Sequence, residues 1–365
     1  MKKKVLHVSS GGLNRGGVAS VVFSIVESLE SDFDFDCVVF NRKSDLEEEF
    51  EKHGTIHRIH CYPKKGKRDY VELLLRPIKL YFGIRKICKE NAYDVIHCHN
   101  QHDCVPCLMA AKHLKVPIRI SHAHVGSDTR RRSGLEKIGK KMFIKKINKV
   151  ATHKVACAAE AGRLLFDNAD SLHIPNGVNL QRFTKKENEV KQATIFVHVG
   201  RFNYAKNQEF LLETFAEISR MIPDAYLYLV GYGETATVAQ IKQQIRTLKI
   251  EDKVVIIPGD QVDIVDYYAK ADYMIFPSRF EGFPVTLIEA QAMGIRCYVS
   301  ERVTTDADMG LSSFHNLSDG PQKWAEFIVS DIQNGPKLTL NQEKLSQYSN
   351  AAVCAKYAAV YRGEA

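Results

Sequence analysis

The chain has 365 residues, of which 45% are hydrophobic and 26% are charged, and its net charge is +8. This length allows two domains of ordinary size, and the composition is that of a globular protein in water. No apolar run reaches the roughly 20 residues that a membrane-spanning helix needs. The basic start MKKKVLHVSS leads into a strand-like segment rather than a signal-peptide core. Nine irregularly spaced cysteines favour a reducing compartment, hence the cytoplasm.

Strand-like and helix-like segments alternate through the first half of the chain. Strands are predicted at 4–10, 35–40, 93–99 and 117–124, helices at 16–30 and 102–115, and a short strand leading into a helix over 154–166. Alternation of this kind is typical of a doubly wound α/β domain with a parallel sheet.

The pattern stops at the turn-rich segment HIPNGVNLQRF and the charged segment TKKENEVKQ, and then it restarts. Strands are predicted at 194–200, 225–233, 253–259, 273–278 and 296–300, and helices at 206–223, 236–250, 262–271, 283–294 and 342–365. We therefore expect a first α/β domain over 1–175, a second over 176–345 and a final helix over 346–365.

The positive charge is concentrated in the first half, where 31 Lys and Arg face 20 Asp and Glu over residues 1–180. The excess lies in KKGKR (64–68) and in RRRSGLEKIGKKMFIKKINK (130–149). Such segments attract nucleic acid, anionic lipid or phosphorylated substrates, and a solvated helix face is the ordinary alternative. Nucleic acid is not expected, because no exposed aromatics are interleaved and no known binding motif is present. Residues 130–149 are predicted to form a basic amphipathic helix, whose apolar stripe either packs on the core or contacts a membrane. The stripe consists of Leu135, Ile138, Met142, Phe143 and Ile147.

The segment HCHNQHDCVPC (97–107) contains three histidines and three cysteines. Cys104 and Cys107 have the Cys-x-x-Cys spacing of zinc sites. No second pair of this kind completes a site, so we favour a buried strand end followed by a loop and a helix of small residues.

Ligands of open α/β sheets bind beyond the carboxyl ends of the strands, where helices begin. After the first strand, SSGGLNRGGVAS places Gly16 and Gly17 before a helix whose free amides suit an anion, although an ordinary strand–helix turn explains the same glycines. After the first strand of the second half, VGRFNYAKN places Arg201 and Lys206 around a turn. These two side chains either bind a pyrophosphate or face solvent.

The segment SRFEGFPVTLIEA (278–290) contains two glutamates with seven residues between them. Proline is tolerated in the first turn of a helix, so we expect Phe283 and Pro284 at the helix start, Glu281 on the preceding loop and Glu289 in the helix. The amides of 283–286 would then face outward as an anion site. Carboxylates accept paired hydrogen bonds from sugar hydroxyls, so this arrangement favours a nucleotide-sugar ligand.

Together these motifs resemble those of the retaining nucleotide-sugar glycosyltransferases of family four, which have the GT-B fold. EGFPVTLIEA is similar to their Glu-x-seven-Glu motif, GRFNYAKN to their Gly-Arg-Leu…Lys segment, IPNGVN to their Pro-Asn-Gly-Val-Asp linker, GGVASVV to their first glycine loop, and SHAH to the strand end that carries their catalytic histidine. Phe202 stands where the family usually has a short aliphatic residue. The resemblance implies two Rossmann-like domains that face a cleft, and a C-terminal helix that crosses back to the first domain.

The resemblance also implies roles for individual residues. Arg201 and Lys206 would bind the donor pyrophosphate, Glu289 the ribose hydroxyls and Glu281 the donor sugar. The implied donor-binding set is Gly16, Gly17, Arg201, Lys206, Glu281, Gly282, Phe283, Pro284, Val285 and Glu289. The implied catalytic set is His124, Arg201, Lys206 and Glu281. His122 is an alternative to His124, and for either histidine a purely structural role is the ordinary alternative.

The resemblance implies a reaction that transfers a hexose or N-acetylhexosamine from a nucleotide-sugar to a glycan or lipid-linked acceptor. The nucleotide is expected to be UDP, on family frequency, and the product to belong to bacterial capsule, exopolysaccharide or lipopolysaccharide. The resemblance implies front-face substitution with retention, in which cations and amides stabilise the leaving diphosphate, and no carboxylate is placed as a covalent nucleophile. The resemblance also implies that no metal or cofactor is needed. The Asp-x-Asp stretches at 34–36 and 306–308 are similar to the metal motif of the other glycosyltransferase fold, but they are discounted because they lie in a strand and a late loop.

Two alternatives are open. The first is a related two-domain enzyme, a nucleotide-sugar epimerase or phosphorylase, and the second, of another functional class, is a non-catalytic nucleotide-sugar-binding partner of an assembly complex. Acceptor-binding residues stay unassigned. The protein is expected in the cytoplasm, with peripheral contact to anionic membrane through residues 130–149.

Overall fold

The computed structural model describes residues 2–9, 12–14, 16–40, 43–61, 70–99, 103–124, 134–167, 170–184, 193–259 and 261–365. It divides into two compact units. Unit 1 comprises Met1–Gly177 and Asn350–Ala365, and unit 2 comprises Val178–Ser349.

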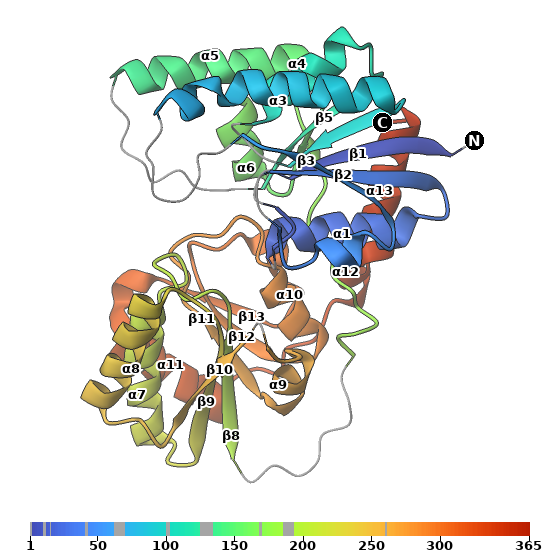
Figure 1. Ribbon diagram of the computed structural model, residues 1–365. Coiled ribbons are helices and arrows are strands. Elements are labelled where there is room, and N and C mark those ends of the chain that lie inside the picture. The colour runs from blue at the N-terminus through green and yellow to red at the C-terminus, as the bar shows by residue number, and fades with distance from the viewer. Residues whose placement is uncertain are drawn as a thin grey trace. The chain divides into compact units, whose positions relative to one another are not determined.

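Unit 1 is built on a parallel sheet in the order β3-β2-β1-β4-β5-β6-β7 (Figure 1). The strands are β1 (Lys3–Ser9), β2 (Phe33–Phe40), β3 (Gly54–Ile59), β4 (Val95–Cys98), β5 (Ile118–Ala123), β6 (His153–Ala156) and β7 (Leu172–His173). The helices are α1 (Gly17–Leu29), α2 (Glu47–Phe50), α3 (Tyr70–Glu90), α4 (Cys104–His113), α5 (Gly134–Val150), α6 (Ala159–Phe166) and α13 (Asn350–Arg362). The inner strands β1, β4 and β5 are almost entirely buried because helices cover both faces of the sheet.

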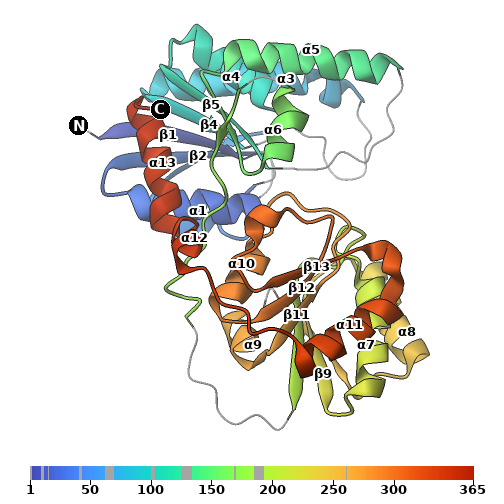
Figure 2. The ribbon, with the colours of Figure 1, turned by 180° about the vertical axis from the view of Figure 1, so that it is seen from behind.

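Helices α3, α4 and α5 form a row on one face of this sheet, and α1 lies beside α13 on the other (Figures 1 and 2). The C-terminal helix therefore returns to the first domain, as the resemblance implied. Its buried residues, including Tyr357 and Tyr361, share one core with Val5 and Phe35 of the sheet. Each such side chain contributes about 1.5–3 kcal/mol by leaving water, which holds the C-terminus on unit 1.

Unit 2 repeats the architecture with a parallel sheet in the order β10-β9-β8-β11-β12-β13. The strands are β8 (Thr194–Val199), β9 (Ala225–Gly231), β10 (Val254–Pro258), β11 (Tyr273–Phe276), β12 (Arg296–Ser300) and β13 (Ser312–His315). The helices are α7 (Gln208–Met221), α8 (Thr235–Leu248), α9 (Val265–Lys270), α10 (Val285–Ala292), α11 (Gly320–Asn334) and α12 (Gln342–Ser346), with short 3-10 turns at Thr305–Ala307 and Leu317–Asp319. The strand order reverses between β8 and β11, the point at which doubly wound sheets bind ligands.

The two α/β halves agree with the fold expected from the sequence, but some elements differ. The helical pattern at 342–365 forms two helices, because the chain turns at Gln347–Ser349 between α12 and α13. The prediction also omitted β3, α3, β13 and α11. β3 is a strand with little burial at one edge of the sheet, and α3 contains Pro77, so neither has a clear sequence signature.

Candidate functional site

The loops that follow β8 and β11 in unit 2 are held together by backbone hydrogen bonds. The amide of Arg279 donates to the carbonyl of Ala205 over 2.7 Å, and the amide of Phe202 donates to the carbonyl of Tyr232 over 2.7 Å. Gly231 permits this close approach, because a Cβ there would lie 2.0 Å from the carbonyl oxygen of Gly200. The fold thus fixes both loops at the strand-order reversal.

These loops bring two of the predicted residues into direct contact. Nζ of Lys206 donates to Oε1 of Glu281 over 2.7 Å, and only 15% and 12% of the two side chains are exposed. The ammonium group also lies 4.7 Å above the ring of Phe276. An anionic ligand that binds Lys206 must therefore compete with Glu281, since the two charges already satisfy one another.

Arg201 is not part of this contact. Its side chain is exposed, and its guanidinium lies against Tyr232, with Nη2 3.3 Å from the hydroxyl and the ring centre 5.5 Å away. The structure therefore brings Lys206 and Glu281 together and leaves Arg201 accessible on the same loop.

Glu289 lies inside α10 as a partly buried residue, and its carboxylate faces Tyr268. The hydroxyl of Tyr268 is 3.2 Å from Oε2 of Glu289 and 3.2 Å from the carbonyl of Thr286. Loss of water around the carboxyl raises the pKa of Glu289 to about 7, against the opposing effects of Tyr268 and of the positive charges of Arg182 and Lys206. No local sequence pattern indicates Tyr268, because its contact with Glu289 joins α9 to α10.

The start of α10 differs from the expected geometry. The helix begins at Val285, so Pro284 is the residue before it rather than its first residue. The amide of Val285 already donates to the carbonyl of Phe283, and proline has no amide hydrogen. Of the four predicted amides, those of Phe283 and Thr286 donate no hydrogen bond within the described residues, which reduces the expected anion site to these two donors. Gly282 is partly exposed on the loop before them.

Four buried polar atoms near the carboxyl ends of β8 and β11 have no hydrogen-bond partner among the described residues. They are Nε2 of His198, Oδ1 of Asn207, Oγ of Ser278 and Oγ1 of Thr286. His198 has a defined tautomer, because its Nδ1 lies 3.0 Å from the carbonyl of Ile275, which can only accept. Buried polar atoms are rarely left unsatisfied, so this cluster indicates a place for a polar ligand.

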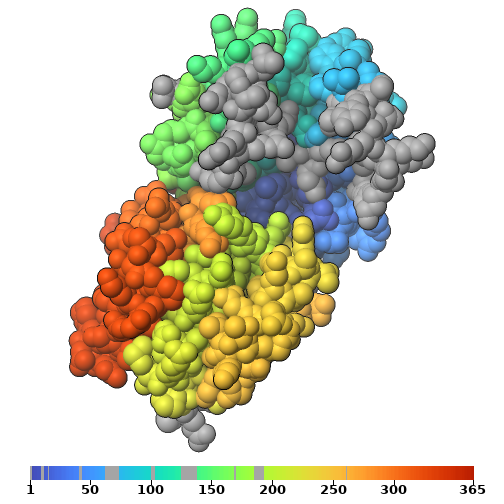
Figure 3. Space-filling view, turned by 90° about the vertical axis from the view of Figure 1, so that its left-hand side faces the viewer, coloured from blue at the N-terminus to red at the C-terminus, as the bar shows by residue number. Residues whose placement is uncertain are grey.

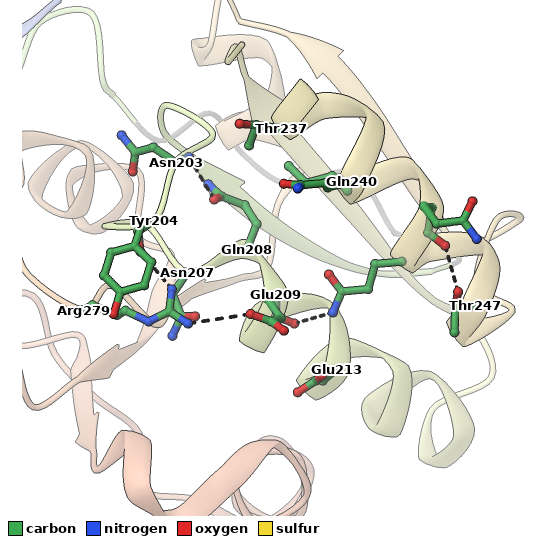
Figure 4. A pocket seen from close by; sticks show the side chains of 13 residues that line it. Asn203, Tyr204, Asn207, Gln208, Glu209, Glu213, Thr237, Gln240, Thr247 and Arg279 are labelled. Atoms are coloured by element: carbon green, nitrogen blue, oxygen red, sulfur yellow. Dashed lines mark hydrogen bonds and ion pairs between the residues drawn. The ribbon is translucent and has the colours of Figure 1, made fainter. Parts of the chain in front are cut away.

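A separate groove of about 790 Å³ lies between α7 and α8 (Figures 3 and 4). Most of its lining residues are polar, and Tyr204, 71% exposed, stands at its edge beneath the guanidinium of Arg279. The groove is lined by none of Arg201, Lys206, Glu281 and Glu289, although it shares Asn207 with the cluster of unsatisfied polar atoms.

In unit 1, Gly16 and Gly17 stand at the start of α1, directly after β1 and the loop that follows it. Among the described residues no side chain caps this helix, and its first turn has no acidic residue, so its leading amides are available to a ligand. A Cβ on Gly17 would meet no atom within 4 Å. Glycine at this position is therefore not required by packing within unit 1.

Five histidines gather where β1, β4 and β5 end: His7, His97, His99, His122 and His124. His122 is fully buried and both of its ring nitrogens have partners, whereas His124 follows the last residue of β5 and is partly exposed. Of the two candidates, only His124 has access to a ligand in solution.

Two overlapping groups of histidines have nitrogen atoms within 4.8 Å of one another, namely His7, His97, His99 and His99, His122, His124. Either arrangement is compatible with a divalent cation, so the expectation of a metal-free enzyme stays a prediction. Cys104 and Cys107 belong to neither group. Both are buried at the start of α4, and the Cys104 thiol faces the carbonyl of Cys98, which does not support the Cys-x-x-Cys zinc reading.

The row of helices in unit 1 carries exposed apolar side chains. On α3, Leu74, Ile78 and Phe82 are 77%, 52% and 61% exposed, and on α5, Ile138 and Met142 are 57% and 68% exposed. Ile147 is fully buried, so the apolar stripe of α5 divides between core and surface. Residues 64–68 and 130–133 lie outside the described residues. No helix in the described ranges is both long and apolar enough to cross a membrane.

Comparison with known proteins agrees with this architecture. The family described as Glycosyltransferase Family 4 matches residues 15–182, and the family described as Glycosyl transferases group 1 matches residues 181–307. The putative glycosyltransferase EpsF of Bacillus subtilis is 30% identical over 367 residues, which span 95% of this chain and 92% of that protein. The capsular polysaccharide biosynthesis glycosyltransferase CapH of Staphylococcus aureus is 25% identical over 94% of each chain.

Among solved structures, Anabaena HepE in complex with UDP and glucose superimposes with a TM-score of 0.78 over 98% of each chain, at 17% identity. At that identity the likeness establishes the fold alone, which is the two-domain GT-B fold expected from the sequence.

Proposed function

Because the chain belongs to glycosyltransferase family 4 and has the GT-B fold, we propose that it transfers a hexose or N-acetylhexosamine from a UDP-sugar to a glycan or lipid-linked acceptor in bacterial surface polysaccharide synthesis. The observation that carries the proposal is the largely buried Lys206–Glu281 pair at the strand-order reversal of unit 2, beside polar atoms that have no hydrogen-bond partner among the described residues. The name of CapH supports the polysaccharide, and the UDP and glucose bound to HepE support the donor.

In this proposal unit 2 binds the donor. Lys206 and the accessible Arg201 take the pyrophosphate and stabilise the leaving UDP, which is electrostatic catalysis by fixed cations. Glu281 contacts the donor sugar once Lys206 has moved to the phosphate. Glu289 accepts hydrogen bonds from the ribose hydroxyls, and the amides near Phe283 and Thr286 add donors beside Gly282, Pro284 and Val285.

Unit 1 binds the acceptor. The amides near Gly16 and Gly17 approach the diphosphate, and His124 faces the donor sugar. The acceptor hydroxyl attacks the anomeric carbon from the side on which UDP departs, and its proton passes to the departing phosphate oxygen, so the anomeric configuration is retained without a covalent intermediate. Exposed apolar residues of α3 and α5, flanked by lysines, would place the protein at the cytoplasmic face of an anionic membrane, where a lipid-linked acceptor resides.

A panel of UDP- and GDP-sugars, with nucleotide release and sugar configuration followed by NMR, tests the proposal. We expect slow release of UDP from one UDP-sugar by the unmodified protein and none by Glu281→Ala. Glu217→Ala is the matched control, since that carboxylate pairs with Arg220 on the surface of α7. An epimerised nucleotide-sugar without UDP release, or tight UDP binding without turnover even with acceptor extracts, would overturn the proposal.

A further inference from the structure

The five histidines of unit 1 form two hydrogen-bonded chains on one face of the sheet. Residues two apart on a strand point to the same face, which places His97 with His99 and His122 with His124, and His7 pairs directly with His97 across β1 and β4. The first chain runs from Nδ1 of His7 to Nε2 of His99 over 2.8 Å, and from Nδ1 of His99 to Nε2 of His124 over 3.0 Å.

The second chain has a hydroxyl at each end, both from α13. Tyr361 lies 2.7 Å from Nδ1 of His97, Nε2 of His97 lies 3.1 Å from Nδ1 of His122, and Tyr357 lies 3.4 Å from Nε2 of His122. A tyrosine hydroxyl can donate or accept. This chain can therefore be oriented in either direction.

The rings of the first chain are neutral at physiological pH. Burial lowers the pKa of His7 to about 3 and that of His124 to about 4. Burial also lowers the pKa of His99 well below its usual range, and the neighbouring histidines lower it further. A neutral imidazole has one N–H and one lone pair, and each hydrogen bond between two rings uses one of each. The three rings of the chain must therefore carry their protons on the same kind of nitrogen.

Two arrangements satisfy this condition, and they differ at the buried end. If all three rings are protonated on Nδ1, His7 leaves only the lone pair of Nε2 without a partner. If all three are protonated on Nε2, His7 leaves an N–H without one. Nε2 of His7 is fully buried and has no partner among the described residues. Orphaned buried N–H groups are rarer than under-satisfied acceptors, so the first arrangement is favoured.

We infer that His7 and His99 are positioning residues that hold His124 as its Nδ1–H tautomer, so that His124 offers a hydrogen-bond donor to its ligand and not a base. Nε2 of His124 is occupied by His99, and its Nδ1 has no partner among the described residues. This inference rests on the proposed function for the identity of the ligand, an oxygen of the donor sugar or the diphosphate, but the tautomer itself does not depend on activity.

The tautomer can be read directly. Long-range ¹H–¹⁵N correlation spectra of the full chain with labelled histidine distinguish protonated from unprotonated ring nitrogens, and the His124 signals are those lost in His124→Gln. We expect Nδ1–H for His124 in the unmodified protein and a mixture of tautomers in His99→Leu. His99→Asn restores Nδ1–H at His124, because the asparagine amide nitrogen takes the place of Nδ1. Tyr357→Phe is the matched control, since it removes a buried hydroxyl from the second chain only.

An Nε2–H signal for His124 in the unmodified protein would overturn the inference, and it would mean that the intrinsic preference of free imidazole for Nε2–H prevails. An equal change of tautomer in Tyr357→Phe would also overturn it, because general repacking would then explain the effect. If turnover is found, we expect His99→Leu to lower kcat on the order of 10- to 100-fold with little change in the donor KM, and His99→Asn to recover part of it. If no donor is turned over, the proposed function fails while the NMR result still decides the inference.

Discussion

Lys206 and Glu281 lie 75 residues apart in sequence, yet the ammonium of one and the carboxylate of the other are 2.7 Å apart in unit 2. The cation predicted to bind the pyrophosphate is thus paired with the carboxylate predicted to bind the sugar. Donor binding must break this contact, so that Lys206 can bind the pyrophosphate and Glu281 can bind the sugar. In the absence of donor, the two side chains therefore neutralise one another, and neither charge is left buried without a counter-charge.

Removing the negative charge of this pair should separate binding from transfer. In Glu281→Gln, Lys206 no longer faces a competing carboxylate, so we expect UDP to bind about 3- to 10-fold more tightly by calorimetry. Turnover should fall at least about 100-fold, because the sugar loses its ionised partner. Glu217→Gln, in an exposed pair, should change neither quantity. Weaker UDP binding by Glu281→Gln would show that Lys206 does not receive the phosphate.

Glu289 predicts a pH dependence of nucleotide binding. Its pKa of about 7 means that the carboxylate forms as the pH rises from 6 to 8, and only the carboxylate accepts two hydroxyl protons. We expect UDP affinity to rise over this range in the unmodified protein relative to Glu289→Gln. The comparison removes the titration of UDP itself, whose terminal phosphate ionises near pH 6. A constant affinity ratio between pH 6 and 8 would contradict the assignment of Glu289 to the ribose.

The same carboxyl should affect stability in the opposite direction. A raised pKa in the folded state means that the protonated form is favoured by folding, so its stabilising contribution is present below the unfolded value of 4.5 and is lost as the pH rises through about 7. The Tm of Glu289→Gln should therefore rise relative to the Tm of the unmodified protein as the pH increases from 5 to 8. A difference in Tm that does not vary with pH would exclude this linkage.

Replacing Gly17 tests, without disturbing the fold, whether the diphosphate of the donor lies against the start of α1. A Cβ there meets no atom within 4 Å, so Gly17→Ala should leave Tm unchanged or slightly higher. If the diphosphate lies against this turn, the methyl group should raise the donor KM about tenfold or more. Gly139→Ala, on α5 and equally unobstructed, is the matched control. An unchanged KM would place the donor away from the start of α1.

The exposed apolar side chains of Ile138 and Met142 on α5 predict that unit 1 contacts a membrane. Replacing both with serine should lower binding to vesicles containing anionic lipid by about tenfold or more in flotation at low salt, because two apolar side chains no longer enter the interface. Met221→Ser, an exposed methionine on α7, should have no effect. If the unmodified protein fails to float with anionic vesicles at low salt, the surface has another role.

Metal removal tests the two histidine groups. Each of the five histidines already has a ring nitrogen hydrogen-bonded to another of them, so we expect dialysis against EDTA to leave turnover unchanged. Loss of turnover that Zn²⁺ or Mn²⁺ restores in the unmodified protein, but not in His99→Leu, would assign a cation to these histidines.

Sequence by itself determined the two-domain α/β architecture, because the alternation of apolar strands and amphipathic helices is a local property of the chain. It also placed Gly17, Lys206 and Glu281 at strand ends or helix starts, since glycine and proline mark those positions in any fold, and it placed Glu289 inside the following helix. The start of α10 was misplaced by two residues, because proline is tolerated both just before a helix and in its first turn.

Only the tertiary structure decided which of these residues meet. The Lys206–Glu281 pair, the contact of Tyr268 with Glu289 and the histidine chain from His7 to His124 each join separate elements. Their partners depend on strand order and helix packing, which bring together residues that no local pattern relates. The choice between His122 and His124 has the same origin: the two residues share a strand face, and α13, arriving from the far end of the chain, buries the first and leaves the second partly exposed.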